Sequence, residues 1–356
     1  INMTSKQLIQ KLQNHGRNKI NKLNTGEWIE IIAANPPCPR SSHQISALGS
    51  SVYCFGGECA PLTSHFGYGA PVPSCAVHTL DLKKADRWSE LEISGNAPSL
   101  RLGHGQAIVQ DKDDTYLYVF GGRQPTEQNA VYDGTEAITS LNDMHKLNLG
   151  TGQWEEVQQK GAIPSVRSYL SLVTYDQHLF LFGGMINNER YNDLYRFDTT
   201  TQHWNKLPDG PMKGRGGAGV CIAGNSLFVV GGFCGYPVND VWEFLISQGE
   251  WRVREDLALP KPISIFACAA SHTDIFVFGG ELIAASGNED AGSYSNEMLL
   301  LHTDATPGYV TTFQTKEGEE APAARGWTSG CAVDLDGEMY FAVFGGIREG
   351  NGKAEE

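Results

Sequence analysis

Apolar and polar positions along the chain follow one pattern that occurs six times. A strand of small residues and a turn lead into an aromatic-rich apolar run, which ends on two glycines. A loop follows, then another apolar strand, a turn and an aromatic residue. Four short strands repeated at a regular interval predict an all-β protein made of antiparallel sheets. The glycine pairs are Gly56-Gly57, Gly121-Gly122, Gly183-Gly184, Gly231-Gly232, Gly279-Gly280 and Gly345-Gly346.

The strand after the loop has its own signature, since Asn-Asp begins it in "LNDMHKLNL", "YNDLYRFDT" and "VNDVWEFLI". The closing aromatic residue is Trp88, Trp154, Trp204 or Trp251, and Phe313 in the fifth repeat. A Gly-Gly pair followed by a separated aromatic pair, such as Tyr195 and Trp204, resembles the Kelch repeat. The resemblance covers almost the whole chain. It implies a six-bladed β-propeller with four antiparallel strands per blade.

The two ends of the chain share the last blade in this interpretation. Only "IREGNGKAEE" follows Gly346, which is too short and polar for two strands, whereas Arg17 to Trp28 is similar to Met144 to Trp154. We therefore expect the N-terminal segment to supply strands three and four, and the C-terminal segment strands one and two, so that no sheet edge stays open. Residues 17–356 then form one propeller. Residues 1–16 are an extension, and Leu8, Ile9 and Leu12 at helical spacing predict a capping helix within residues 4–13.

Composition narrows the function classes. A net charge of -14 and an isoelectric point of about 5.2 argue against general binding to nucleic acid or anionic membranes. No apolar stretch has the roughly 20 residues that cross a bilayer, and without a visible secretory signal we expect a cytoplasmic protein. Cys54 and Cys59 lack a second pair for zinc. Three further cysteines at matching repeat positions are expected to be buried, small apolar residues; they are Cys221, Cys268 and Cys331.

Basic residues recur ahead of the first strand of the repeats. We call them the loop arginines: Arg40, Arg101, Arg167, Arg215 and Arg325, with Ile263 in the fifth repeat. One hypothesis is that they surround the channel mouth and bind a carboxylate, sulfate or phosphate. The alternative is structural, with each arginine pairing with a neighbouring blade or with a loop carbonyl.

Other candidates lie near the same mouth. His43 and His104 follow their arginines by three residues, a pattern more typical of hydrogen bonding between blades than of catalysis. Trp327 is expected either to stack on a ligand over the channel or to belong to the core. Three long loops on this face, 58–75, 123–140 and 281–295, are where recognition is expected.

A second resemblance concerns "RGGAGV" (215–220), "VFGGE" (277–281) and "RGWTS" (325–329). These segments are similar to plant specifier proteins, which form nitriles, epithionitriles or thiocyanates. That family redirects the aglycone that myrosinase releases from a glucosinolate, using ferrous iron. The resemblance implies a Glu-x3-Asp-x3-His site after the fifth glycine pair. Here Glu281 stands at the first position, followed by Ala285 and Glu289.

The departure from that motif changes the expected chemistry. The candidate metal ligands become Glu281, Glu289 and Asp290, and a carboxylate-only cluster favours harder cations than iron. The leading hypothesis is therefore a recognition protein without a cofactor, which binds an acidic peptide or a small anion at the arginine face. The alternative is a specifier-like lyase with Fe(II) in a degenerate site. A Kelch-type sugar-acid mutarotase, which would also use such arginines, stays open.

Overall fold

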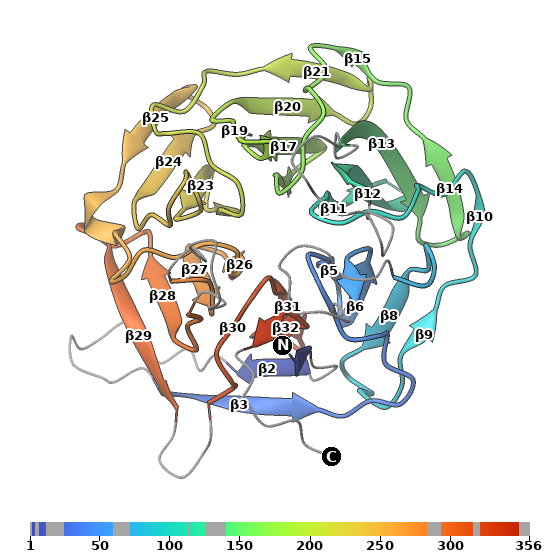
Figure 1. The fold of residues 1–356 in the computed structure, drawn as a ribbon, viewed down its shortest axis with the longest axis horizontal. Coiled ribbons are helices and arrows are strands. Elements are labelled where there is room, and N and C mark those ends of the chain that lie inside the picture. Colours follow the sequence, from blue (N-terminus) through green and yellow to red (C-terminus); the bar gives the residue numbers. More distant parts are fainter. Residues whose placement is uncertain are drawn as a thin grey trace.

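The computed structural model describes residues 2–3, 7–11, 25–59, 72–112, 114–124, 140–282, 293–315 and 321–348. Within these ranges the chain is built of β-strands, with one short 3-10 helix, η1 (Glu255–Leu257). The strands form a ring around a central axis, which confirms the predicted all-β propeller (Figure 1). No helix within these ranges is long and apolar enough to span a membrane.

Six consecutive four-strand units make up the ring, each antiparallel throughout and running from the axis to the rim. Unit 1 has β5 (Gln44–Leu48), β6 (Ser51–Phe55), β8 (His78–Asp81) and β9 (Ser89–Glu90); unit 2 has β11 (Gly105–Asp111), β12 (Asp114–Arg123), β13 (Ser140–Asn148) and β14 (Gln153–Glu156); unit 3 has β16 (Ser171–Tyr175), β17 (His178–Phe182), β20 (Leu194–Asp198) and β21 (His203–Lys206). Unit 4 has β22 (Gly219–Ala223), β23 (Ser226–Val230), β24 (Val241–Leu245) and β25 (Glu250–Val253); unit 5 has β26 (Ala267–Ser271), β27 (Asp274–Phe278), β28 (Met298–His302) and β29 (Tyr309–Thr315); unit 6 has β31 (Ser329–Leu335), β32 (Glu338–Phe344), β2 (Gln7–Lys11) and β3 (Thr25–Ile31).

Hydrogen bonding divides these strands among five large sheets, not the six separate blades predicted from the sequence. Four sheets hold one unit each, while units 5 and 6 share one eight-stranded sheet in the order β26-β27-β28-β29-β3-β2-β32-β31. The connection is a short parallel contact of the two outermost strands, Gln314 with Thr25 and Thr315 with Gly26. The predicted count is corrected for this reason.

The shared last unit follows the predicted closure, because N-terminal β2 pairs antiparallel with C-terminal β32. The strand boundaries differ from the prediction. The third strand is Gln7–Lys11, so the expected capping helix over residues 4–13 is wrong in this part. Pairing with β32 on one side and β3 on the other outweighs the helical spacing of the apolar residues.

Further two-residue strands lie outside these units and pair either with an outer strand or with one another. β10 (Ser94–Gly95) and β15 (Lys160–Gly161) run parallel to the outer strands β14 and β21. Three further groups pair antiparallel: β4 (Arg40–Ser41) with β7 (Glu58–Cys59), β18 (Met185–Ile186) with β19 (Glu189–Arg190), and β33 (Ile347–Arg348) with both β1 (Asn2–Met3) and β30 (Arg325–Gly326).

Aromatic contacts between neighbouring units hold the ring together. A tryptophan in the outer strand of one unit, or directly before it, packs on the phenylalanine that precedes the glycine pair of the preceding unit. In Trp204 against Phe120, the ring centroids are 5.5 Å apart. The same arrangement joins Phe55–Trp154, Phe182–Trp251, Phe278–Trp28 and Phe344–Trp88. Burying such large rings stabilises each junction by roughly 1.5–3 kcal/mol per side chain. The closing tryptophans of four repeats, Trp88, Trp154, Trp204 and Trp251, thus belong to the interfaces between units.

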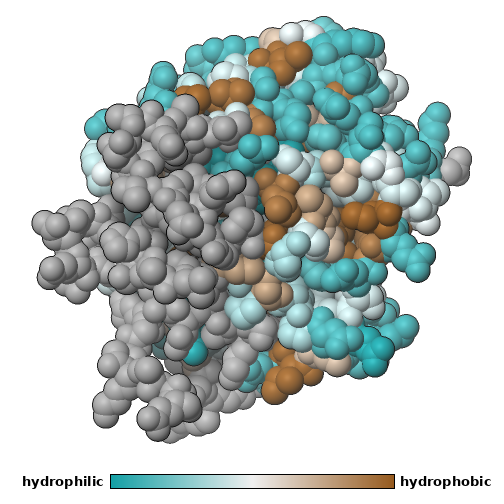
Figure 2. All heavy atoms as spheres, turned by 45° about the vertical axis from the view of Figure 1, so that its right-hand side comes forward, coloured by the Kyte–Doolittle hydropathy of each residue, from teal (hydrophilic) through white to brown (hydrophobic). Residues whose placement is uncertain are grey.

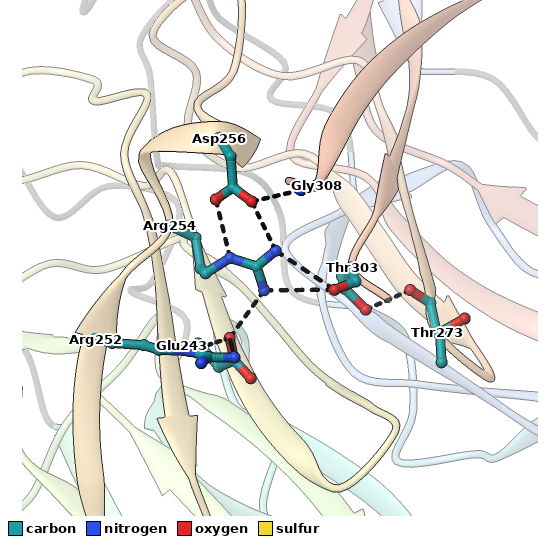
Figure 3. A network of polar contacts seen from close by, with 7 residues as sticks. All are labelled: Glu243, Arg252, Arg254, Asp256, Thr273, Thr303 and Gly308. Carbon is teal, nitrogen blue, oxygen red and sulfur yellow. Dashed lines mark hydrogen bonds and ion pairs between the residues drawn. The ribbon is translucent and has the colours of Figure 1, made fainter. Parts of the chain in front are cut away.

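At the junction of units 4 and 5, a polar network joins the two units (Figure 3). Arg254 donates through Nη1 to Glu243 of β24 and through Nε and Nη2 to Asp256 of η1. Asp256 also accepts from the backbone N–H of Gly308, at 2.6 Å, in the turn between β28 and β29. These bonds join the units where the fifth repeat has Ile263 in place of an arginine.

The described surface on the side shown in Figure 2 carries many hydrophilic residues. Figure 2 shows hydrophobic residues on the side turned forward in separate groups among hydrophilic ones. Large exposed apolar residues such as Ile32, Tyr236 and Tyr309 are spread over different units. Scattered apolar residues of this kind are normal for a protein surface and do not by themselves mark a binding site.

Candidate functional site

A closed cycle of backbone hydrogen bonds surrounds one mouth of the channel. Each unit contributes the residue two positions after its loop arginine, or after Ile263. Its N–H donates to the carbonyl of the corresponding residue in the preceding unit, at 2.6–3.2 Å. All six have positive φ: Ser42, Gly103, Tyr169, Gly217, Ile265 and Trp327. Because four of them are not glycine, the cycle holds a strained backbone in place. We call this cycle the mouth ring.

A second cycle explains the glycine pairs. The N–H of the second glycine donates to the carbonyl of the loop arginine, or of Ile263, in the next unit, at 2.8–3.0 Å. These second glycines have φ between 91° and 105°. At Gly184, a Cβ would lie 2.9 Å from the carbonyl oxygen of Ser168 and from Cβ of Leu170. Only glycine fits this backbone and this space.

The loop arginines are buried inside the units, with exposed fractions of 0–3%. Each donates through Nε to the carbonyl two residues before it and through Nη1 to the carbonyl of the first glycine of its own unit. For Arg167 these acceptors are the carbonyls of Ser165 and Gly183, both at 3.0 Å. The same bonds form at Arg40, Arg101, Arg215 and Arg325. This geometry corresponds to the structural alternative, since these guanidinium groups do not line the mouth.

The aspartates of the Asn-Asp signature complete three of these sites. Asp193 accepts from both Nη atoms of Arg167, at 2.6 and 3.0 Å. Asp143 binds Arg101 and Asp240 binds Arg215 in the same two-point manner. Burial opposes the charged form of Asp143, but hydrogen bonds from Arg101 and His145 hold its pKa below the usual value. A bidentate ion pair of this kind fixes the loop before the first strand onto the loop after the second.

The first and last units differ in how their arginine is balanced. Arg40 donates to the sulfur of Cys38 at 3.2 Å, at the position where units 2 and 3 have a serine hydroxyl, and no ion pair with a carboxylate is seen for it among the described residues. Burial lowers the pKa of Arg325 to about 10, and the positive charge of Arg348 adds to this effect. Units 1 and 6 therefore have the same backbone contacts as the others but different electrostatics.

The two histidines fill space between units. His43 contacts Phe344 edge-to-face and His104 contacts Phe55 in the same way. Both are buried, and burial lowers the pKa of each to about 3, with the nearby arginines contributing. Units 3 and 5 have Leu170 and Phe266 at the corresponding position. The imidazoles are thus neutral packing groups at the junctions. The hydrogen bonding between blades that the sequence suggested is not seen, because none of their four ring nitrogens has a hydrogen-bond partner among the described residues.

The channel itself has a cavity of about 390 Å³, lined by the first strand of every unit. Tyr169 and Trp327, which belong to units on opposite sides of the mouth ring, meet edge-to-face with centroids 5.5 Å apart. Arg123 lies over the ring of Tyr169 at 5.5 Å and donates to its hydroxyl at 3.2 Å. These three partly exposed side chains form what we call the mouth cluster. Its indole N–H, Nε1 of Trp327, is buried and has no acceptor among the described residues.

Acidic groups lie at the same level as Arg123, directly after other glycine pairs. Glu58 is buried and accepts from the hydroxyl of Ser42 at 3.0 Å. Glu281 is also buried, and its backbone pairs with Ser264 and Tyr294. At the described positions directly after the glycine pairs, the charged residues are therefore Arg123, Glu58 and Glu281, whereas the five loop arginines lie inside the units.

The structure describes only one of the three predicted metal ligands. Glu281 is described, whereas Glu289 and Asp290 lie outside the described residues. No group of three metal-binding side chains is present in the part of the chain that the structure describes. The sequence itself departs from the Glu-Asp-His donor set that suits ferrous iron, since Ala285 and Glu289 stand where that set has its aspartate and histidine. We therefore derive no iron chemistry from Glu281.

Sequence reasoning left Trp327 open between a stacking position over the channel and the core, and it missed Tyr169 and Arg123 as site residues. Two repeat positions carried the signal: the residue two after the loop arginine and the residue directly after each glycine pair. The first position gives every member of the mouth ring, and the second gives Glu58, Arg123 and Glu281.

Comparisons with known proteins agree with this architecture. The family model of the KLHDC2/KLHL20/DRC7 Kelch-repeats domain matches residues 67–280. The N-(sulfonatooxy)prop-2-enimidothioate sulfolyase of Thlaspi arvense is 27% identical, over 93% of this chain and 95% of that protein. Kelch domain-containing protein 2 of Bos taurus is 28% identical, over 79% of this chain and 71% of that protein. The solved structure of YjhT has a TM-score of 0.64 at 18% identity, covers 90% of this chain and 98% of that one, and supports the fold alone.

Proposed function

Because the chain belongs to the KLHDC2/KLHL20/DRC7 Kelch-repeats domain family, we propose that it is a Kelch-propeller recognition protein that binds an anionic group at the mouth cluster. The group belongs to a small ligand or to an acidic peptide. The five loop arginines shape the mouth from inside the units, and Arg123 takes the binding role first assigned to them. The proposal includes the cytoplasmic location predicted from the sequence, which a fluorescent fusion of the full chain tests.

The observation that carries this proposal is the position of Arg123. Its guanidinium lies against the Tyr169 ring at the channel mouth, where it is partly exposed. The contact with the Tyr169 ring and the hydrogen bond to its hydroxyl position the guanidinium. A guanidinium recognises a carboxylate or sulfate by two-point contact. The indole N–H of Trp327 adds a donor, and the two aromatic rings add an apolar surface.

The nearby acids restrict the ligand. Glu58 and Glu281 are buried at the same level and reduce the positive potential of the mouth. A polyanion gains one favourable contact here and meets two like charges. We therefore propose a ligand with a single anionic group next to an apolar part, rather than a strongly acidic chain.

A matched pair of ligands tests this proposal. Phenylacetate and phenylacetamide differ in charge but little in shape, and their binding to the full chain is measured by calorimetry or ligand-observed NMR. We expect saturable binding of the anion only. Arg123→Ala should weaken it by roughly 10- to 150-fold, as expected for losing a charged hydrogen bond of about 1.5–3 kcal/mol.

Arg87→Ala serves as the control, because Arg87 is exposed beside the outer strand β9 and carries the same charge. The Arg87→Ala variant should bind phenylacetate with the same affinity as the unmodified protein. Equal binding of both ligands, or an unchanged affinity in Arg123→Ala, would contradict the proposal.

A second candidate function is a specifier-like lyase, favoured by the similarity to the Thlaspi arvense sulfolyase over nearly the full length of both chains. The substrate in that protein's name carries a sulfonatooxy group, so this function also needs an anion site. Incubation with myrosinase, a glucosinolate and Fe(II) distinguishes the two candidates. A changed product pattern that is lost in Glu281→Ala supports the lyase, and unchanged products support recognition without turnover.

A further inference from the structure

Two thiols lie side by side next to the loop arginine of unit 1. The sulfur atoms of Cys38 and Cys59 are 2.8 Å apart, about 0.8 Å more than a disulfide bond. Cys59 ends β7, which pairs with β4, and Arg40 of β4 lies directly opposite it. Arg40 donates through Nη2 to the Cys38 sulfur at 3.2 Å. This is a three-residue cluster that the proposed binding function does not use.

Comparison with the other units shows what the cluster replaces. Strand register places Ala76 where unit 2 has Asp143, so unit 1 lacks the carboxylate that balances the arginine. Cys38 occupies the position of Ser99 and Ser165, two residues before the arginine, where a hydroxyl accepts from Nη2. In the described residues, Arg40 therefore finds two backbone carbonyls and one sulfur.

The surroundings favour a thiolate at Cys38. A hydrogen bond from the Cys59 thiol lowers the pKa of Cys38 to about 6, burial opposes this change, and the charge of Arg40 adds to it. The pKa of Cys59 is raised by the same hydrogen bond, so this residue keeps its proton. A thiolate beside an arginine is the reactive form of cysteine.

Cys38 is also accessible. It is half-buried and lines a cavity of about 560 Å³ on the outer side of unit 1, together with Arg40, His78 and Arg87. A small polar reagent such as a peroxide fits easily into this volume. Cys38 thus combines a nearby arginine, a neighbouring thiol and access from a cavity.

We propose that Cys38 is a peroxide-sensitive thiol and that Cys59 is its resolving partner. The Cys38 thiolate attacks one oxygen of hydrogen peroxide, the O–O bond breaks, and Cys38 becomes a sulfenic acid while hydroxide leaves. The Cys59 sulfur then attacks the Cys38 sulfur. The S–S bond forms, the S–O bond breaks, and the thiol proton leaves with the departing hydroxyl as water. Both cysteines together lose two electrons, which the peroxide accepts.

Oxidation would change both the connectivity and the charge of unit 1. The disulfide ties the segment before the first strand to the segment after the first glycine pair. It also removes the negative partner of Arg40. The reaction is therefore a modification that acts at the base of one of the long loops of the mouth face.

The first test measures thiolate reactivity with 4,4′-dithiodipyridine on the reduced full chain. At pH 5.5 a thiol of pKa 6 has about 240 times more thiolate than one of pKa 8.5. Its lower intrinsic nucleophilicity reduces the advantage to roughly 20-fold. We expect Cys38 to react at least about 20-fold faster than Cys75, which is similarly half-buried and whose pKa is raised by burial. Mass spectrometry of the labelled peptides assigns each rate.

The second test treats the reduced protein with hydrogen peroxide and blocks the remaining thiols before digestion. A Cys38–Cys59 peptide should form, and Cys59→Ser should instead leave a sulfenic acid at Cys38 that dimedone labels. Cys75→Ser is the control and should behave as the unmodified protein. Equal reactivity of Cys38 and Cys75, no cross-linked peptide, or a bond that strong reductants fail to open would each overturn the proposal. The unmodified protein supplies all three readouts, so folding of the variants does not decide the outcome.

Discussion

The ion pair of Arg167 and Asp193 offers the sharpest test of how the loop arginines act. Arg167 is fully buried and Asp193 is 9% exposed, with two hydrogen bonds of 2.6 and 3.0 Å between them. Asp193→Ala leaves a buried guanidinium without its counter-charge. Breaking a buried pair in this way costs about 3–5 kcal/mol, which is a large part of the stability of an ordinary domain.

The equivalent pairs in units 2 and 4 give an internal scale. The side chains of Asp143 and Asp240 are 29% and 35% exposed, against 12% for Asp193. Water screens the more exposed pairs, so Asp240→Ala should cost only about 1–2 kcal/mol. The exposed Asp209, which pairs with Lys206 on the surface, supplies a control expected to lie within about 0.5 kcal/mol of the unmodified protein.

Urea unfolding followed by tryptophan fluorescence measures these differences, provided that the m-value stays constant across the variants. The double variant Arg167→Met/Asp193→Leu removes both charges and should be no less stable than Asp193→Ala alone. A cost below about 1 kcal/mol for Asp193→Ala, or the same cost for Asp193→Ala and Asp240→Ala, would refute the view that a desolvated ion pair anchors this loop.

Three further predictions follow from the junctions between units. Gly184→Ala should destabilise the protein by more than about 2 kcal/mol, because φ is +93° and Ser168 and Leu170 occupy the space that a Cβ needs. Gly235→Ala is the control: φ is +107°, but a Cβ there meets no atom within 4 Å, so the cost should be about 1 kcal/mol. Thermal unfolding compares the two variants. His104 has a pKa of about 3 in the folded state against 6.5, so the stability it contributes is complete above pH 6.5 and falls as the pH falls towards 3, by about 1.4 kcal/mol per pH unit. His104→Leu, which copies Leu170 of unit 3, should flatten that part of a stability–pH curve, and an unchanged slope would exclude His104 as its source. Hydrogen bonds from Arg254 lower the pKa of Asp256 to about 2, so their contribution is present above pH 4 and disappears as the pH falls through 2; Asp256→Asn should lower the denaturation midpoint at pH 7 and leave it nearly unchanged at pH 2.

Much of the fold was readable from the sequence, because the propeller is built from local repeats. The glycine pairs and closing tryptophans mark positions that the backbone and the junctions dictate, and the described structure uses them in that way. The N-terminal strand was mistaken for a helix since its partner, β32, lies at the other end of the chain. The number of sheets was missed because a two-residue contact, Gln314–Thr315 with Thr25–Gly26, decides it.

The candidate site was harder to predict because its contacts are not repetitive. An arginine ahead of a strand has the same spacing whether it points into the mouth or into its own unit. Its aspartate partner lies 26 residues away in unit 3 and 42 in unit 2. Tyr169 and Trp327 meet across the channel from opposite units, and no pattern in either repeat announces that contact. Cys38 and Cys59 lie 21 positions apart, in the unit where the aspartate is missing.

The shared last unit has a consequence for synthesis of the protein on the ribosome. Gln7 of β2 pairs with Phe344 of β32, which is translated 337 positions later. At about 5–20 residues per second, the N-terminal strand waits roughly 17–67 s for its partner. During that time units 1 to 5 can assemble in order. The last unit stays incomplete, because β2 still lacks its partner β32. A chaperone that covers unpaired strand edges would act on this incomplete unit. The ring closes only after β31 and β32 have left the exit tunnel and paired with β2.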